Sequence, residues 1–156
     1  MKKRQTGFTL IELVIVISII AALTAVALPK YVAVQKDARV AKMQAIYGSV
    51  RTAAALAKAR CELDLAAVVA GGLCTATAGS VNMDGTTVTM VNRYPAAGSI
   101  AVAAGVDSVN DGMTVVVGAS TTFTAAGAST PASCLITYNE AAANAAPVIT
   151  LDTTGC

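Results

Sequence analysis

A chain of 156 residues, of which 55% are hydrophobic and only 13% charged, has room for one domain and an appendage. The formal net charge is +2, but beyond residue 64 a single arginine faces five acidic residues, which argues against a nucleic-acid-binding surface there. Histidine is absent, so the commonest general base and a common metal ligand are missing, and hydrolase or metalloenzyme chemistry is disfavoured.

The first element is a predominantly apolar run of 21 residues from Phe8 to Leu28. As a helix rising ~1.5 Å per residue, it would span ~30 Å, about the thickness of a hydrocarbon core. Lys2, Lys3 and Arg4 precede the run, so we expect the N-terminus to stay cytoplasmic and the remainder to be exported. An ordinary secretory signal peptide would have a shorter apolar region that ends at a small-residue cleavage site.

Glu12 is the one charged residue within this apolar run. A carboxylate at such a position costs on the order of 2.5–3.5 kcal/mol on membrane-insertion scales, so it indicates function and needs a partner. No cation lies within the run to serve as that partner.

The segment around Glu12 resembles the processing site of type IV prepilins, and its sequence is GFTLIEL at residues 7–13. The resemblance extends closely over about the first 60 residues. It implies that residues 1–7 are a leader, and that a membrane-bound prepilin peptidase cuts after Gly7 and methylates the new N-terminus at Phe8. The mature chain would then carry an α-amine at the edge of its apolar run.

The resemblance also implies a partner for Glu12, namely the Phe8 amine of a neighbouring subunit. An unpaired buried charge is far costlier than a paired one, so this pair would fix the axial register of assembly. The alternative is that Glu12 simply lies in the lipid headgroup region.

The helical pattern continues beyond the run, with residues 8–29 as a transmembrane and filament-core helix and residues 30–65 as its amphipathic continuation. Pro29 is predicted to kink the helix because it removes a hydrogen bond. Seven basic residues between Lys30 and Arg60 are interpreted as a solvated face near the membrane. Apolar residues recur at three- and four-residue steps on the other face: Met43, Ile46, Tyr47, Val50, Ala53, Ala54 and Ala57. The stretch after Pro29 most resembles the mannose-sensitive haemagglutinin branch of type IVa pilins.

Residues 66–156 are predicted to form a small β-sheet head. Short runs rich in Val, Ile and Thr read as strands at 86–92, 99–103, 113–117, 133–138 and 148–151. Asp84-Gly85 and Asp111-Gly112 are turn signals. We therefore expect an antiparallel sheet that packs on the amphipathic helix.

The four cysteines allow three pairings. An exported head would lie in an oxidising compartment, and no Cys-x-x-Cys spacing indicates zinc or a redox pair. We expect Cys61–Cys74 to tie the helix end to the next loop and Cys134–Cys156 to close the C-terminal segment. The second pair resembles the C-terminal disulfide loop of pilins.

No metal site, cofactor or catalytic constellation is expected, because the many Ser and Thr residues lack a histidine base. Residues 107–112 resemble a calcium loop, but the third position lacks an oxygen ligand and the twelfth is Gly118. We interpret the segment as a turn rich in Asn and Asp. The Ser- and Thr-rich stretch 119–130 is a candidate for glycosylation.

Taken with the resemblance, these elements predict an α+β type IV pilin fold, with the long N-terminal α-helix as the stem of a lollipop and a small antiparallel β-sheet head. The implied function is that of a structural subunit, not an enzyme, which polymerises into a helical surface filament for adhesion or motility. The implied partners are other copies of the chain, the prepilin peptidase and the inner-membrane assembly machinery; the surface ligand is unknown. The precursor would lie in the inner membrane and the pilus at the cell surface. The alternatives are a type II secretion pseudopilin and a membrane-tethered binding module that does not polymerise.

Overall fold

The computed structural model describes residues 8–66 and 73–156, so the leader residues 1–7 lie outside the described part. The chain divides into two compact units, residues 1–37 and 38–156, and the first helix contributes to both. This helix, α1, runs from Leu10 to Leu65 and comprises 56 residues. The predicted long helix is therefore confirmed, and it continues through Pro29 without ending there.

In the first unit, every described residue is exposed within the chain. In the second unit, α1 buries one face made of Met43, Val50, Ala53, Ala54, Ala57 and Cys61. The steps of three, four and seven residues place these side chains on one stripe of a 3.6-residue helix. The apolar face predicted from the sequence is the face that packs, with Ile46 and Tyr47 half-buried at its edge.

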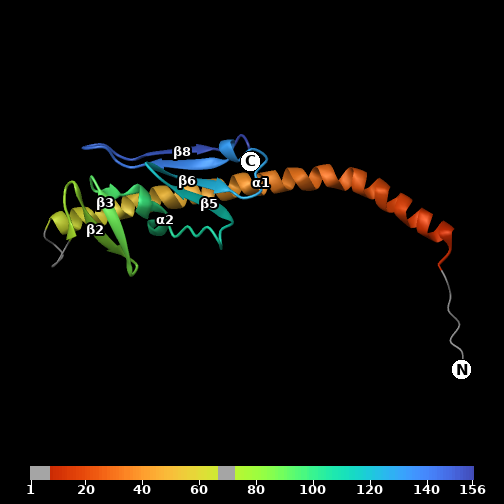
Figure 1. The fold of residues 1–156 in the computed structure, drawn as a ribbon, viewed down its shortest axis with the longest axis horizontal. Helices are drawn as coiled ribbons and strands as arrows, with labels where there is room; N and C mark the ends of the chain where they lie inside the picture. Colours follow the sequence, from red (N-terminus) through yellow and green to blue (C-terminus); the bar gives the residue numbers. More distant parts are fainter. Residues whose placement is uncertain (1–7, 67–72) are drawn as a thin grey trace, which may run out of the picture. The chain divides into compact units, whose positions relative to one another are not determined.

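Two four-stranded antiparallel sheets pack against this part of α1, rather than the single sheet that was expected (Figure 1). Sheet A has the order β1-β2-β3-β4, and its strands are β1 Leu73–Cys74, β2 Ala78–Met83, β3 Thr86–Val91 and β4 Tyr94–Pro95. Sheet B has the order β5-β6-β7-β8, and its strands are β5 Met113–Val117, β6 Ser120–Ala125, β7 Leu135–Asn139 and β8 Val148–Asp152. Each strand pairs with the next along the chain, so both sheets are meanders.

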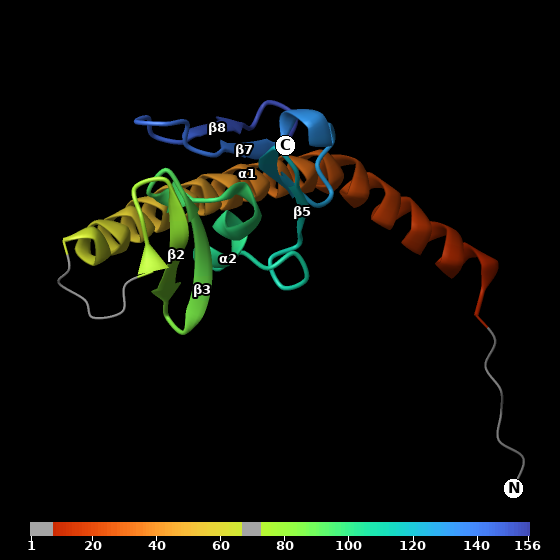
Figure 2. The same ribbon diagram turned by 60° about the vertical axis from the view of Figure 1, so that its left-hand side comes forward.

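The segment 99–103 was predicted as a strand, and this prediction was wrong. A 3-10 turn, Ala97–Ser99, is followed there by the short helix α2, Ile100–Ala103. The segment is only five residues long and alanine favours helix, so its apolar content does not distinguish the two states. Ile100 is fully buried and attaches α2 to the core. Figure 2 shows α2 beside β3.

The core has two parts. The larger lies between sheet B, α2 and α1, and its largest buried side chains are Tyr138, Phe123, Met43, Ile100 and Ile136. The smaller lies between sheet A and the end of α1, and it consists of Ala57, Cys61, Cys74, Val81, Val88 and Met90. Two buried hydroxyls connect sheet B to the segment that follows β3, because Tyr138 donates to the Pro95 carbonyl at 2.6 Å and Thr121 to that of Ala97. Burial, reinforced by the nearby Glu140 and Tyr94, raises the pKa of Tyr138 well above its usual value.

Candidate processing and assembly site

The first turn of α1 contains an N-terminal cap that the sequence reading missed. Thr9 precedes the helix, and its backbone N–H and hydroxyl donate to Oε2 of Glu12 at 2.9 and 2.7 Å. The Glu12 N–H donates in return to Oγ1 of Thr9 at 3.3 Å. This is a capping box, and the signal that could have found it is Thr-x-x-Glu before an apolar run.

The cap explains why α1 begins at Leu10 and what holds Glu12 in place. The carboxylate lies at the helix N-terminus, where free amide groups and the helix dipole favour a negative charge. All three hydrogen bonds of the cap use Oε2 or the backbone of Glu12, so within the described residues Oε1 remains an acceptor for a further donor. Phe8 stands immediately before the cap and is 82% exposed, and Gly7 lies outside the described residues.

From Leu10 to Leu28 the helix presents apolar side chains all round, and it is long and apolar enough to cross a membrane. Its two hydroxyl groups are bonded within the helix, Ser18 to the Val14 carbonyl and Thr24 to the Ile20 carbonyl. Such internal bonding suits an environment without water. An apolar surface of this size needs a cover, either lipid or other chains.

Pro29 lies inside α1, where it cannot donate to the carbonyl one turn earlier. Leu23, Thr24, Ala27, Leu28 and Tyr31 line a shallow, largely apolar groove beside it. The kink at Pro29 stays a prediction.

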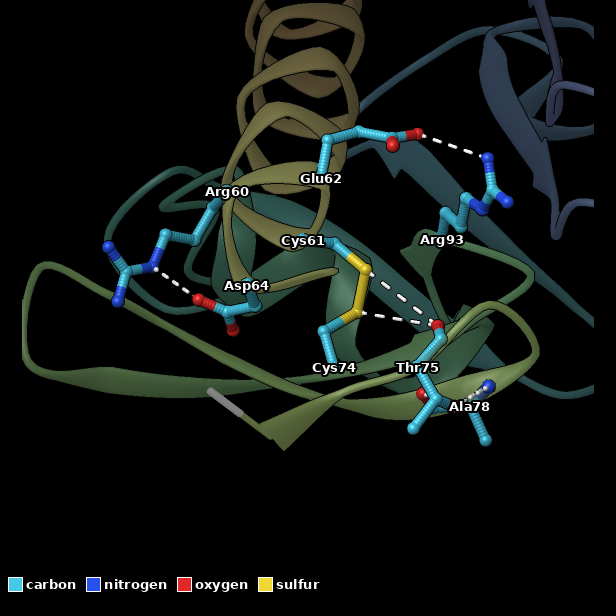
Figure 3. The surroundings of a disulfide bond; sticks show 8 residues. All are labelled: Arg60, Cys61, Glu62, Asp64, Cys74, Thr75, Ala78 and Arg93. Atoms are coloured by element: carbon cyan, nitrogen blue, oxygen red, sulfur yellow. Dashed lines mark hydrogen bonds and ion pairs between the residues drawn. A yellow bond between two sulfur atoms is a disulfide. The ribbon is translucent and has the colours of Figure 1, made fainter. Parts of the chain in front are cut away.

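Both predicted disulfides are present. Cys61–Cys74 joins the last turns of α1 to β1, with Cα atoms 5.3 Å apart (Figure 3). Cys134–Cys156 joins the start of β7 to the residue that ends the sequence, with Cα atoms 4.9 Å apart. All four cysteines are buried, so each bridge is part of the core it closes.

The segment closed by Cys134–Cys156 is mostly sheet and not a free loop. It contains β7, β8 and the connection between them, and its end is fastened to α1 because Nε of Arg39 donates to the Cys156 carbonyl at 2.9 Å. A Cβ at Gly155 would lie 2.5 Å from the Thr130 carbonyl oxygen, so the chain passes very closely there. Most of the β7–β8 connection is exposed, although Ala141 within it is buried.

Three basic residues of α1 contact the head, although the basic face was interpreted as solvated. Arg39 binds the Cys156 carbonyl, Lys42 donates to the Asp111 carbonyl, and Lys58 lies over the ring of Tyr94. These cations therefore help to attach the head to its helix.

The turn at 107–112 satisfies its own acidic groups. The Asp107 carboxylate accepts from the Val109 N–H and the Asn110 amide, and the Asp111 carboxylate accepts from the Asp107 N–H. Within residues 8–66 and 73–156, no cluster of three His, Cys, Asp or Glu residues could hold a metal ion. The geometry is that of the Asn- and Asp-rich turn.

Comparison with known proteins gives a family motif and two kinds of relative. Residues 2–28 match the prokaryotic N-terminal methylation motif. The chain is 38% identical over 98 residues to prepilin peptidase-dependent protein D of Escherichia coli K12, covering 63% of this chain and 59% of that protein. It is 45% identical over 53 residues to the type IV major fimbrial protein FimA of Dichelobacter nodosus, covering 34% of each chain. The matched region thus spans between a third and three fifths of these relatives. No solved structure matches the chain at comparable significance.

A methylation motif at the start of a long apolar helix, with that helix continuing into an antiparallel α+β head, is the arrangement expected of the type IV pilin fold. The motif and the relatives show that the chain is similar to proteins of type IV fimbriae and to a prepilin peptidase-dependent protein. The relatives from Dichelobacter nodosus are named as major fimbrial proteins.

Proposed function

We propose that the protein is the structural subunit of a type IV pilus. Hydrolysis of the Gly7–Phe8 peptide bond by the prepilin peptidase frees the Phe8 amine, which is then methylated. The observation that carries the proposal is the uncovered apolar surface of residues 10–28, with Glu12 as the one carboxylate in its first turn.

Residues 8–29 anchor the precursor in the inner membrane and then form the filament core, where copies of the same helix replace the lipid. Burial of apolar area supplies the driving force in both settings, and the apolar segment is uniform enough to pack at many axial offsets. Glu12 removes that freedom, because only an offset that places the Phe8 amine of a neighbour beside its carboxylate leaves no buried charge unpaired.

The capping box refines this role. Thr9 and Glu12 hold one another through Oε2, so the carboxylate is already oriented in the single chain and Oε1 is offered to the neighbour. The mature N-terminus lies one residue before this cap, so every subunit presents its amine and its carboxylate within the first helical turn. This supports head-to-tail helical symmetry, which gives an open polymer.

Residues 30–65 support the head and residues 66–156 form the surface of the filament, where adhesion is expected to reside. The assembly machinery of the inner membrane adds subunits and supplies the force for motility. A type II secretion pseudopilin would share the processing site, but it would form only a short periplasmic filament.

The test is to shear cells and analyse the released material by intact-mass and N-terminal spectrometry. A species that begins at methylated Phe8 and lacks the four hydrogens lost to two disulfides is the expected result. Recovery of the processed chain only from the membrane fraction favours a pseudopilin. A chain uncut at Gly7 contradicts the proposal and favours a tethered binding module.

A further inference from the structure

The head contains a polar cavity of about 390 Å³ that the assembly role does not use. Its walls come from three parts of the second unit. They are Lys58 on α1, residues 76–77 with the β3–β4 turn at 92–93 and Tyr94 of β4, and the β7–β8 connection at 143–146. The volume falls in the range of ~300–1,000 Å³ typical of small-molecule sites.

The cavity is held in shape by its own backbone. Asn92 joins the walls, since its N–H donates to the Thr77 carbonyl at 3.0 Å and its side-chain amide to the Ala141 carbonyl at 2.8 Å. Asn92, Arg93 and Asn144 have positive φ values of 50°, 70° and 58°, which non-glycine residues adopt at some cost. The turn that carries Arg93 therefore has a fixed direction, and the site is organised before any ligand arrives.

Two cations converge on this cavity from a head that is otherwise acidic. Arg93 is the only basic residue beyond residue 64, where five acidic residues lie. Nζ of Lys58 lies 5.2 Å from the ring centroid of Tyr94, and Lys58, Tyr94 and Arg93 all line the cavity.

Arg93 pairs with Glu62, and this pair leaves part of the Arg93 guanidinium available to bind a ligand. Its Nη1 is 3.3 Å from Oε1 of Glu62, and the two side chains are 45% and 43% exposed (Figure 3). Exposed pairs of this kind contribute little. Within the described residues, the pair uses Nη1 alone, so Nε and Nη2 remain as a fork that matches a carboxylate.

We propose that this cavity binds a sugar acid, as the terminal residue of an otherwise neutral glycan. Arg93 and Lys58 bind the carboxylate, and the amides of Asn92 and Asn144 and the hydroxyl of Thr77 bind ring hydroxyls. The apolar walls are alanines, which offer too little surface for a lipid chain. Two cations in the lining are too few to neutralise the many phosphates of a nucleic acid or other polyanion.

The experiment uses the full-length chain, isotope-labelled, with its disulfides intact, in detergent micelles. Methyl β-glucuronide and methyl β-glucoside differ only in the carboxylate, and each is titrated while NMR shifts are followed. The glucuronide is expected to give saturable shifts at the side-chain amides of Asn92 and Asn144. Its affinity is expected to exceed that of the glucoside by at least about tenfold, as removal of a charge-assisted contact implies.

Variants identify the residues that bind. Arg93→Gln and Lys58→Gln are each expected to weaken glucuronide binding by about tenfold or more. Ala145→Phe fills the cavity without changing any charge and is expected to abolish binding. The matched control is Arg51→Gln, which removes a cation that lies 5.7 Å from the Tyr47 ring on the same helix but outside this cavity. Its affinity should equal that of the unaltered protein, and unshifted core resonances verify the fold of each variant.

Three results overturn the proposal. They are equal affinity for the glucoside and glucuronide, undiminished binding by both Arg93→Gln and Lys58→Gln, and acetate or phosphate binding as tightly as the glucuronide. Because binding is measured on the unassembled chain, failure here is separate from failure of the filament proposal.

Discussion

The two halves of α1 form one continuous helix, but they differ in burial. Between residues 10 and 37 no described side chain is buried within the chain, whereas beyond Ala38 one stripe is buried against two sheets. Helical hydrogen bonding is the same in both halves, so secondary structure does not decide which half is covered. The first half therefore has an apolar surface that no other part of the described chain buries. The second half is covered on one face by the two β-sheets.

The largest effect should come from removing the carboxylate of the proposed charge pair, Glu12, in the first half. Glu12→Ala is expected to reduce the yield of sheared filament at least about a hundredfold, because an uncompensated Phe8 amine in the filament core costs about 3–5 kcal/mol. Membrane insertion and the head should be unchanged. Quantitative immunoblotting of the sheared and membrane fractions measures both effects.

Thr9→Ala separates capping from pairing. It removes the two hydrogen bonds of the Thr9 hydroxyl while keeping the Glu12 carboxylate, and should cost about 1 kcal/mol at the helix end. Filament yield should then fall far less than in Glu12→Ala. Equal losses in the two variants would show that Glu12 acts as a helix cap and not as an intermolecular partner.

A second comparison places one truncation in each half. Met43 is fully buried, so Met43→Ala should lower the free energy of unfolding of the head by about 2–5 kcal/mol. Leu23 is 66% exposed, and Leu23→Ala should change it by less than about 0.5 kcal/mol. Urea unfolding of the detergent-solubilised chain, followed by tyrosine near-UV circular dichroism, measures both. Similar losses in the two variants would show that the head depends on the first half of the helix.

Both disulfides lie in the second unit, so each should stabilise the head and not the first half of α1. Replacing Cys61 and Cys74, or Cys134 and Cys156, by alanine is expected to lower the free energy of unfolding by about 3 kcal/mol. The second loss should be slightly the larger, because the bridges span 13 and 22 residues respectively. The same urea experiment ranks them. A wild-type unfolding midpoint in either double variant would remove that bridge from the account of stability.

Local pattern was enough to predict the features that repeat along the chain. The apolar run and the amphipathic stripe from Met43 to Ala57 were visible in the sequence. The four cysteines allowed three pairings, and the expected pair Cys134–Cys156 was supported by the resemblance to pilins. Strand β6 was missed because three of its six residues are threonines and its buried Thr121 reads as polar. That threonine is satisfied by the Ala97 carbonyl, a partner 24 residues away that no local pattern reveals. Thr121 is therefore not a glycosylation acceptor in the folded head.

Nonlocal geometry limits the site predictions in the same way. The cavity between Lys58, Arg93 and the β7–β8 connection joins segments that are up to about 90 residues apart, so its walls meet only through the topology of two sheets. The capping box is the opposite case. Thr9 and Glu12 are three residues apart, and the pattern Thr-x-x-Glu before an apolar run is itself the sequence signal of a capping box. The resemblance to prepilins implies only the intermolecular role of Glu12.

The smallest effect concerns a second carboxylate held by a threonine, this time in the head. Asp152 accepts hydrogen bonds from the Thr154 N–H and hydroxyl at 2.9 and 2.7 Å. The bond from the backbone N–H has the larger effect, and both bonds lower the pKa of Asp152 below its usual value. A lowered pKa favours the folded state above the unfolded-state pKa, and this contribution is lost as the pH falls through the folded-state value. NMR titration should find Asp152 below 3.8, and Thr154→Val should raise its pKa towards that value. Because Asp152 is on the head and not in the apolar segment, Asp152→Asn should leave the filament yield unchanged. If Asp152→Asn reduced the filament yield as strongly as Glu12→Ala, loss of a carboxylate far from the apolar segment would impair assembly equally. That result would contradict the proposal that Glu12 acts by pairing with the Phe8 amine of a neighbouring subunit.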